Sequence, residues 1–299
     1  MEAQRAVRRL IAAAGVVSCA VSAFAEGPGT QLKFSQRPAP NMGLNRGSDF
    51  DARFFPGFPN WAVADDFPNA LPNVGIRTVR WWGSYFAPGT EPVPDPTNPG
   101  RFVPVTEEGF SLTFFRDIPA GAAGGFSMPG LDLGTYVAPA SSVRITPTPL
   151  IGWDQHRVWQ YEVDLKNTCL DHPRGPEARP GEFVQLADPI YWLSVSAFNG
   201  ASVVVPSPGG DWFFEPNNDP PITSHWWGWH TSPDNFMDLP TMGMIGMPAG
   251  STEWLFGPWQ PIQPEHMGVG QAFELLVVPA PGAVLTLAIG GLLVLRRRR

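Results

Sequence analysis

Cysteine is nearly absent from this chain of 299 residues, which has only two. We expect Cys19 to be lost with an N-terminal export segment, which leaves Cys169 as the single thiol of the mature protein. One cysteine cannot form an intramolecular disulfide, so the exported fold must depend on its core. Pairing of Cys169 with another chain stays open.

Lysine is equally scarce, with Lys33 and Lys166 the only two. The two terminal segments hold seven arginines and one glutamate, so the mature region keeps 13 basic against 26 acidic residues, a net charge of −13. Such an acidic surface repels phosphates, which argues against a nucleic-acid partner. The region also has no polybasic face for anionic lipid.

Signatures of common catalytic and metal sites are also missing. No serine lies in a Gly-x-Ser-x-Gly elbow, and the five histidines are too widely spaced for a zinc site. We therefore predict that the protein is not an enzyme. A secreted glycan hydrolase remains as an alternative, because it needs two carboxylates about 5 to 10 Å apart and sequence does not supply that distance. The carboxylates considered for it are Glu107, Glu108, Glu162 and Asp164.

No segment of the mature region keeps an amphipathic helical period for more than two turns. The chain is instead rich in aromatic residues (12 Trp, 20 Phe) and in turn formers (35 Pro, 32 Gly). This mixture predicts an all-β fold, namely a single jelly-roll-like β-sandwich over residues 61–277 with long Pro/Gly-rich loops, preceded by an extended N-terminal arm at 26–60. No repeat of fixed period is present, which sets aside a propeller or a solenoid.

Side-chain alternation assigns faces to two of the expected strands. In the segment 157–165, Trp159, Tyr161, Val163 and Leu165 share one face, which we expect to be the core face. The neighbours Trp81 and Trp82 must point to opposite faces, so they cannot share one core. The expected strands are 61–67, 76–85, 109–117, 142–146, 157–165, 189–197, 226–231 and 271–277.

The first 25 residues have the layout of a secretory signal peptide. Arginines at positions 5, 8 and 9 precede an apolar run at 10–21, and Ala23 and Ala25 form a small-x-small site for signal peptidase. The run is too short for a membrane-spanning helix. As an alternative, Val16–Cys19 resembles a lipobox, at which Cys19 would be lipidated.

The last 22 residues predict a membrane stop. Val278, Pro279, Ala280 and Pro281 precede an apolar segment at 283–295, which we expect to form a helix, and then the basic cluster Arg296, Arg297, Arg298 and Arg299. A terminal arginine cluster is retained on the cytoplasmic side of a membrane. The segment therefore predicts transient anchoring in the inner membrane, and an ordinary single-span anchor is the alternative.

This order of parts resembles the PEP-CTERM sorting tail, although Ala280 stands where that tail usually has glutamate. The resemblance covers only the tail. It implies processing by an exosortase-type membrane protease and delivery to the outer surface or the extracellular matrix, with exopolysaccharide as a candidate partner.

The region between the two ends resembles an uncharacterised β-sandwich domain of bacterial secreted proteins. That family has no assigned activity, so the resemblance supports the expected boundaries and fold and implies no site residue. The motifs that carry it are 64–67 (ADDF), 79–85 (VRWWGSY), 109–110 (GF), 114–120 (FFRDIPA), 161–163 (YEV), 190–195 (IYWLSV), 227–229 (WGW) and 273–275 (FEL).

Two groups of residues are candidates for ligand binding. Trp82, Trp227, Trp229 and His230 could form a sugar-binding surface, because sugar faces stack on indole rings while polar neighbours bond to the hydroxyls. Asp65 and Asp66 are candidate ligands of a structural Ca²⁺, the one cofactor left open. The leading hypothesis is a non-enzymatic, structural or adhesive surface protein, and a carbohydrate-binding module is the first alternative.

Overall fold

The structure, a computed structural model of the chain, describes residues 30–40, 43, 45–47, 49–50, 60–85, 91–104, 109–122, 125–152, 155–171, 173–198, 202–206, 212–216, 227–234, 239–246, 255–256, 258–262 and 270–278. The segments predicted as a signal peptide (1–25) and as an apolar tail helix (283–295), residues 279–281 of the predicted sorting motif and the terminal arginines lie outside these ranges. No helix in the described ranges is long and apolar enough to cross a membrane.

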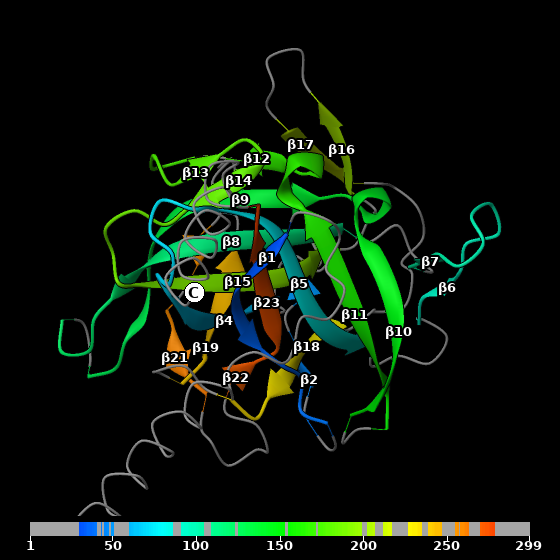
Figure 1. Cartoon of the computed structure of the whole chain (residues 1–299), viewed down its shortest axis with the longest axis horizontal. Helices are drawn as coiled ribbons and strands as arrows, with labels where there is room; N and C mark the ends of the chain where they lie inside the picture. Colours follow the sequence, from blue (N-terminus) through cyan, green and yellow to red (C-terminus); the bar gives the residue numbers. More distant parts are fainter. Residues whose placement is uncertain are drawn as a thin grey trace, which may run out of the picture.

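The protein is all-β, as the sequence predicts, and nearly all of its strand pairs are antiparallel. The larger sheet, called sheet A, has its strands in the order β1-β23-β5-β11-β10-β7-β6, with further strands attached to β5 and β18 (Figure 1). Its members are β1 (Gln31–Gln36), β2 (Asn45–Gly47), β5 (Gly75–Tyr85), β6 (Val93–Pro94), β7 (Phe102–Val103), β10 (Arg144–Ile151), β11 (Arg157–Asp164), β13 (Ala178–Arg179), β14 (Glu182–Val184), β18 (Trp227–Ser232), β22 (Gly270–Gln271) and β23 (Phe273–Val277).

The second sheet, called sheet B, has the order β12-β9-β8-β15-β4-β19-β20. Strands β16 (Ser202–Pro206) and β17 (Trp212–Pro216) form a separate hairpin, and the short 3₁₀ turns η1 (Ala140–Ser142) and η2 (Leu165–Asn167) are the helical elements described. The members of sheet B are β3 (Asp49–Phe50), β4 (Asn60–Pro68), β8 (Gly109–Ile118), β9 (Met128–Ala138), β12 (Cys169–Asp171), β15 (Ile190–Phe198), β19 (Thr241–Gly246), β20 (Leu255–Phe256) and β21 (Gln260–Pro261).

The main core contains aromatic residues of both sheets. Trp81 and Tyr161 of sheet A stack with ring centroids 5.6 Å apart, and Phe110 of sheet B packs edge-on against Trp81 at 5.2 Å. The expected core face of β11 is confirmed, since Trp159, Tyr161, Val163 and Leu165 all belong to this cluster. Burial of these rings is the main source of stability in a fold without disulfides in its described part.

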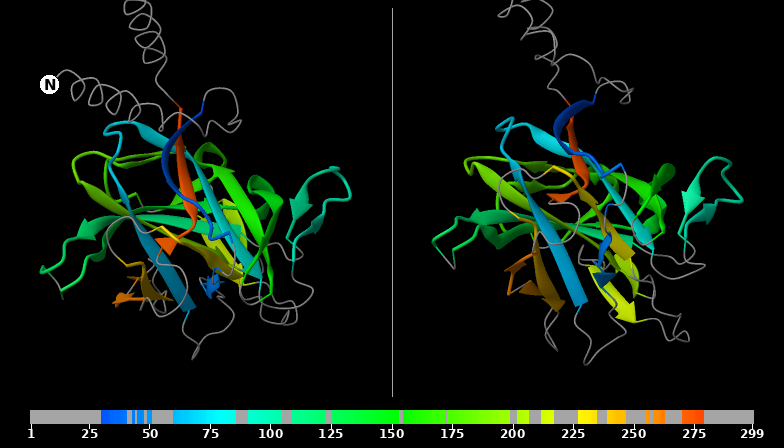
Figure 2. Two further views of the ribbon diagram at one scale, coloured as in Figure 1. Left: turned by 60° about the horizontal axis from the view of Figure 1, so that its bottom comes forward. Right: turned by 90° about the horizontal axis from the view of Figure 1, so that it is seen from below.

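The N-terminal segment that we expected to be an extended arm contributes strands to both sheets. Strand β1 pairs with β23, with Gln31 opposite Val277, and β2 pairs with β18. Figure 2 shows β1 in blue beside the orange-red β23. In β1, Leu32 and Phe34 alternate with Lys33 and Ser35 over only four residues, and β2 has three residues in all. Such short patterns are weak strand signals, and pairing with distant strands makes these segments part of the sheet.

Strand β9 is also absent from the sequence prediction because Pro129, Gly130 and Gly134 interrupt its pattern. The glycine at 134 has a packing reason: a Cβ there would lie 2.6 Å from the Cβ of Ala178. Glycine thus lets the β13 segment approach β9, although it weakens the local strand propensity.

Candidate functional site: a buried polar centre and an outer charge row

The tryptophans proposed for sugar stacking are buried. Trp81 lies in the main core, whereas Trp82 lies on the other face of β5 with Val158 and Ala272, which confirms that the two rings do not share a core. Trp227 is fully buried against Phe110, with ring centroids 5.3 Å apart.

The remaining two residues of that group are buried as well. The indole Nε1 of Trp229 donates to the carbonyl of Ala272 at 2.9 Å, and the carbonyl of His230 accepts from the amide of Ala272 at 2.8 Å. Both side chains are inaccessible to solvent. Together with Trp82 and Trp227, these residues contribute to packing in this structure and offer no open ring face to a sugar.

The pleat of β4 separates the two candidate calcium ligands. Asp65 shares a face with the core residues Val63 and Phe67, whereas Asp66 shares the opposite face with Ala64. The two carboxylates therefore do not converge on one ion. Across the described ranges, no three His, Cys, Asp or Glu side chains form a group that could hold a metal.

Asp65 instead organises a buried polar centre, which we define as Asp65, Gln36, Arg46 and Gln271. The Oδ2 atom of Asp65 accepts from Nε2 of Gln36 at 3.1 Å and from the amide N of Gln271 at 2.5 Å. Its Oδ1 atom accepts from the amide of Asp66 at 3.0 Å. With its amide oriented to suit its neighbours, Gln271 accepts from Nη1 of Arg46 at 2.8 Å and donates to the carbonyl of Trp229 at 3.2 Å.

Burial dominates the electrostatics of this centre. Burial raises the pKa of Asp65 well above its usual value and the adjacent Asp66 adds to the rise, against the effect of the three hydrogen bonds. Burial also lowers the pKa of Arg46 to about 10, an effect that the nearby Asp65 opposes. Burying a charged side chain costs free energy, and burying it without a partner costs more. The stability of each residue in the polar centre therefore depends on the others.

The polar centre joins both ends of the domain to sheet B. Gln36 closes β1, Gln271 lies in β22 just before β23, and Asp65 is on β4. The space is tight, because a Cβ on Gly270 would lie 2.4 Å from Oε1 of Gln36 and 2.3 Å from the carbonyl oxygen of Asp234. Sequence reasoning missed Gln36, Arg46 and Gln271, since their partners are distant in the chain and no motif marks them.

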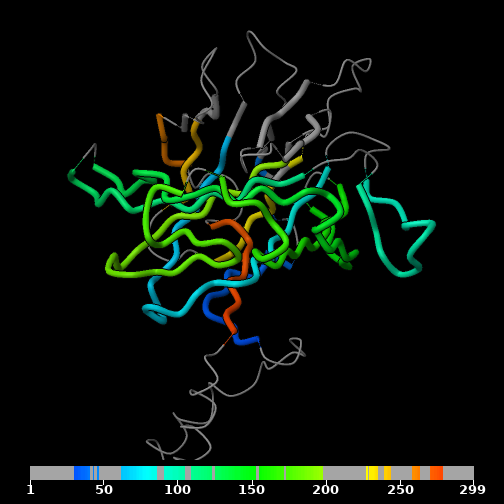
Figure 3. Tube along the Cα trace, turned by 90° about the horizontal axis from the view of Figure 1, so that it is seen from above, coloured from blue at the N-terminus to red at the C-terminus, as the bar shows by residue number. Residues whose placement is uncertain are grey.

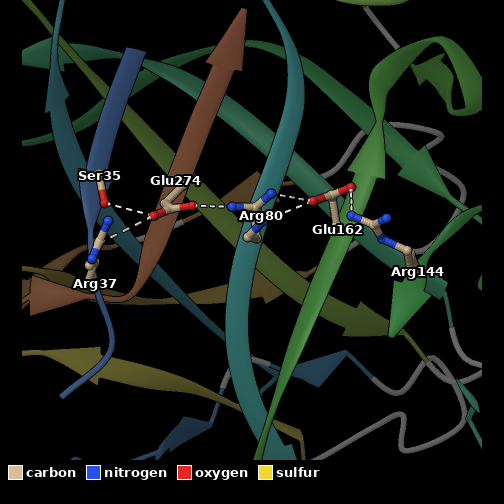
Figure 4. Close-up of polar contacts among 6 residues, drawn as sticks. All are labelled: Ser35, Arg37, Arg80, Arg144, Glu162 and Glu274. Atoms are coloured by element: carbon tan, nitrogen blue, oxygen red, sulfur yellow. Dashed lines mark hydrogen bonds and ion pairs between the residues drawn. The ribbon is translucent and has the colours of Figure 1, made fainter. Parts of the chain in front are cut away.

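A second polar arrangement crosses the outer face of sheet A. Strand register places Ser35, Glu274, Arg80, Glu162 and Arg144 in one row over β1, β23, β5, β11 and β10 (Figure 4). Arg80 is the centre of the row: its Nη1 lies 2.5 Å from Oε2 of Glu274, and its Nη2 lies 2.7 Å from Oε2 of Glu162. Arg37 also lies beside Glu274 (Figure 4), with its Nε atom 3.9 Å from Oε1 of Glu274.

One of the carboxylates considered for glycan hydrolysis, Glu162, forms ion pairs within this row. Glu162 lies between Arg80 and Arg144 and bonds to both. Partial burial lowers the pKa of Arg80, but the two glutamates outweigh that effect and raise it. Asp164 accepts from the amide of Lys166 at 3.0 Å and thereby caps η2. Glu107 and Glu108 lie outside the described residues.

We predict that Arg80→Ala lowers the free energy of unfolding by about 1–2 kcal/mol, because Glu162 and Glu274 would face each other without their shared cation. The side chain of Arg80 is 18% exposed, and that of Glu274 is 8% exposed. The loss should shrink in high salt, because ions screen carboxylate repulsion. Urea unfolding at two salt concentrations measures it.

The matched control is Arg144→Ala at the open end of the same row, where the side chain is 64% exposed. Removal of so exposed a partner should change the stability by less than about 0.5 kcal/mol. Equal effects of the two substitutions would contradict the central position of Arg80.

A family model described as a domain of unknown function, DUF7901, matches residues 32–276. The match extends from β1 into β23, so it spans both sheets and the polar centre, and the chain belongs to this family. No curated protein and no solved structure matches the chain.

Proposed function

We propose that the protein is exported, anchored transiently by its C-terminal tail, and retained at a bacterial cell surface or in its extracellular matrix with a structural or adhesive role and no catalytic activity. Signal peptidase and an exosortase-type protease would process its two ends. The sequence of the ends supports this proposal, through the Ala23/Ala25 site and the order of sorting motif, apolar segment and arginines at 278–299.

One structural observation carries the proposal furthest: the last strand of the described residues ends where the tail begins. Strand β23 ends at the buried residue Val277, which is opposite Gln31 of β1 and Ile76 of β5. The next residue, Val278, is 51% exposed and opens the sorting motif. Removal of residues 279–299 would therefore leave every described strand of both sheets in place.

The architecture suits a passive, durable role. We infer a jelly-roll sandwich from eight main strands in two layers, β1-β23-β5-β11 and β4-β15-β8-β9. The chain changes layer between successive main strands except from β8 to β9, which are neighbours in one layer. The residues proposed for ligand or metal binding that the structure describes are packed or bonded inside the fold, and Glu162 is held by arginines. These contacts support the structural reading over the carbohydrate-binding and hydrolase alternatives.

Cell fractionation tests the proposal. We expect the full chain to be recovered from the envelope or matrix of a bacterium that has an exosortase-type protease, and a chain that ends at Val277 to appear in the medium in folded form. A control in which Arg296–Arg299 are replaced by serine should also escape retention, because the membrane stop is lost. Identical partition of the full and the shortened chain would overturn the proposal.

A further inference from the structure

The end of the domain from which the tail emerges has a distinctive surface, which we call the exit surface and define as Thr30–Leu32, Asn69–Val74 and Val278. In Figure 3, the red β23 and the blue β1 project from one side of the body, near the cyan connection between β4 and β5. Hydrogen bonds confirm this proximity, since Nζ of Lys33 in β1 donates to the carbonyls of Leu71 and Val74, both at 2.8 Å.

The tether between this surface and the apolar tail segment is short. Five residues, 278–282, separate the end of β23 from Ala283. Even a fully extended chain of that length spans at most about 18 Å, and two of the five are prolines whose φ is fixed. If the apolar segment is in a bilayer, the exit surface must therefore lie close to the headgroup layer.

The exit surface carries no formal charge. Its members are Thr, Gln, Leu, Asn, Ala, Pro and Val, of which Gln31, Ala70, Pro72, Asn73 and Val278 are exposed. Residues 26–277 carry a net charge of −13, so this end of the domain differs in charge from the acidic chain as a whole. It can approach anionic headgroups with little of the repulsion that an acidic face would meet.

The bordering charges lie in ion pairs. Arg77 lies 3.2 Å from Glu182, and Arg116 lies 2.9 Å from Asp188 and 3.0 Å from Glu177. Asp188 belongs to the segment that holds the loop, because its carbonyl accepts from Nδ2 of Asn69 at 3.2 Å. Burial lowers the pKa of Lys33 to about 8, and its ammonium is turned inward to fix the loop.

We propose that the exit surface lies against the lipid headgroups while the tail is in the membrane, so that the domain has one fixed orientation and the motif Val278–Pro281 is confined to the membrane interface. This inference rests on the proposed membrane insertion of the tail and adds to it the face that meets the bilayer. Strand β5 would then run away from the membrane, from Gly75 at the exit surface to Tyr85 at the far end.

Two label positions distinguish the ends of β5. The substitution Ala70→Cys places a label on the exit surface. The substitution Ile151→Cys places one in the β10–β11 hairpin, where the Ile151 side chain is 46% exposed. Ile151 pairs with Arg157, and Trp159 pairs with Gly83, so the hairpin is at the far end of β5, roughly 30 Å from Gly75 along the strands. Cys19→Ser and Cys169→Ala remove the native thiols.

The experiment uses the full chain in vesicles of phosphatidylethanolamine with a minority of phosphatidylglycerol, some of it carrying a nitroxide on the headgroup. A fluorophore at residue 70 should be quenched at least about threefold more than one at residue 151, since a nitroxide quenches only at short range relative to the roughly 30 Å between them. Insertion of roughly 20 Gly/Ser residues after Val278 should reduce the quenching at residue 70, because such a linker lets the domain move away.

The outcomes separate this inference from the proposed function. Chains that float with the vesicles but show equal quenching at the two positions would overturn the orientation and leave tail anchoring intact. Quenching at residue 70 that does not respond to the insertion would overturn the tether as its cause. Failure of the intact chain to float would overturn tail anchoring, and the orientation with it.

Discussion

Replacement of Trp227 by alanine is expected to lower the free energy of unfolding by about 3–5 kcal/mol, the usual loss for a fully buried large aromatic residue. The ring is inaccessible to solvent and packs edge-on against Phe110 and Tyr161, with centroids 5.3 Å and 6.0 Å away. The remaining cavity would lie within the main core. Urea unfolding followed by far-UV circular dichroism measures the change.

The same substitution separates a packing role from sugar stacking. Leu131→Ala, at a side chain 48% exposed, is the matched control and should change the stability by less than about 0.5 kcal/mol. If Trp227→Ala kept wild-type stability and instead abolished binding on a glycan array, the packing role would be contradicted and the carbohydrate-binding alternative favoured.

Substitution of Asp65 by alanine is expected to cost about 3–5 kcal/mol, because it removes the acceptor from the amide of Gln271 and from Nε2 of Gln36 and takes the carboxylate from beside Arg46. Loss of these contacts should loosen β1 and β22 from β4 of sheet B. Hydrogen exchange should therefore accelerate at the amides of β1 and β22, in addition to the fall in the free energy of unfolding.

The stability should also depend on pH through this carboxyl group. Burial, with a contribution from Asp66, raises the pKa of Asp65 in the folded state, whereas an unfolded aspartate titrates near pH 3.9. Between these two values the unfolded chain releases a proton that the folded chain keeps, so the free energy of unfolding falls as the pH rises. Below the window, where both states are protonated, the contribution to stability is fully present.

The isosteric variant Asp65→Asn tests this pH dependence, because it keeps the shape and has no proton to release. The stability of the wild type relative to Asp65→Asn should therefore decline as the pH rises from about 4. A series of unfolding curves across that range measures the difference. Parallel pH profiles for the two proteins would contradict a raised pKa at Asp65.

Much of the strand arrangement could be predicted from local pattern. Alternation in 157–165 assigned the core face of β11 correctly, and the adjacent Trp81 and Trp82 had to face opposite ways. Strand β9 was missed because Gly130 and Gly134 break its pattern. Strand β1 was missed because its alternation of Leu32 and Phe34 with Lys33 and Ser35 covers only four residues. These strands are defined by pairing across the sheet, which a local window does not contain.

The candidate site was predictable only in part, for a related reason. The sequence pointed to Asp65 and Asp66 as a pair, but the pleat of β4 separates them, and the partners of Asp65 are Gln36 and Gln271, 29 and 206 residues away. Glutamine and backbone amides carry no recognisable motif. Only the folded chain brings such groups together.

By itself, the sequence determined the all-β class and the chemical character of the two ends, because these follow from composition and local periodicity. The tertiary structure decided which tryptophans are buried, which acidic residues are paired, and that β1 lies beside β23 at the point where the tail begins. Burial and pairing depend on contacts between segments that are distant in the chain. In this protein such contacts bring Gln271 to Asp65 in the buried polar centre, and Lys33 to Leu71 beside the uncharged exit surface.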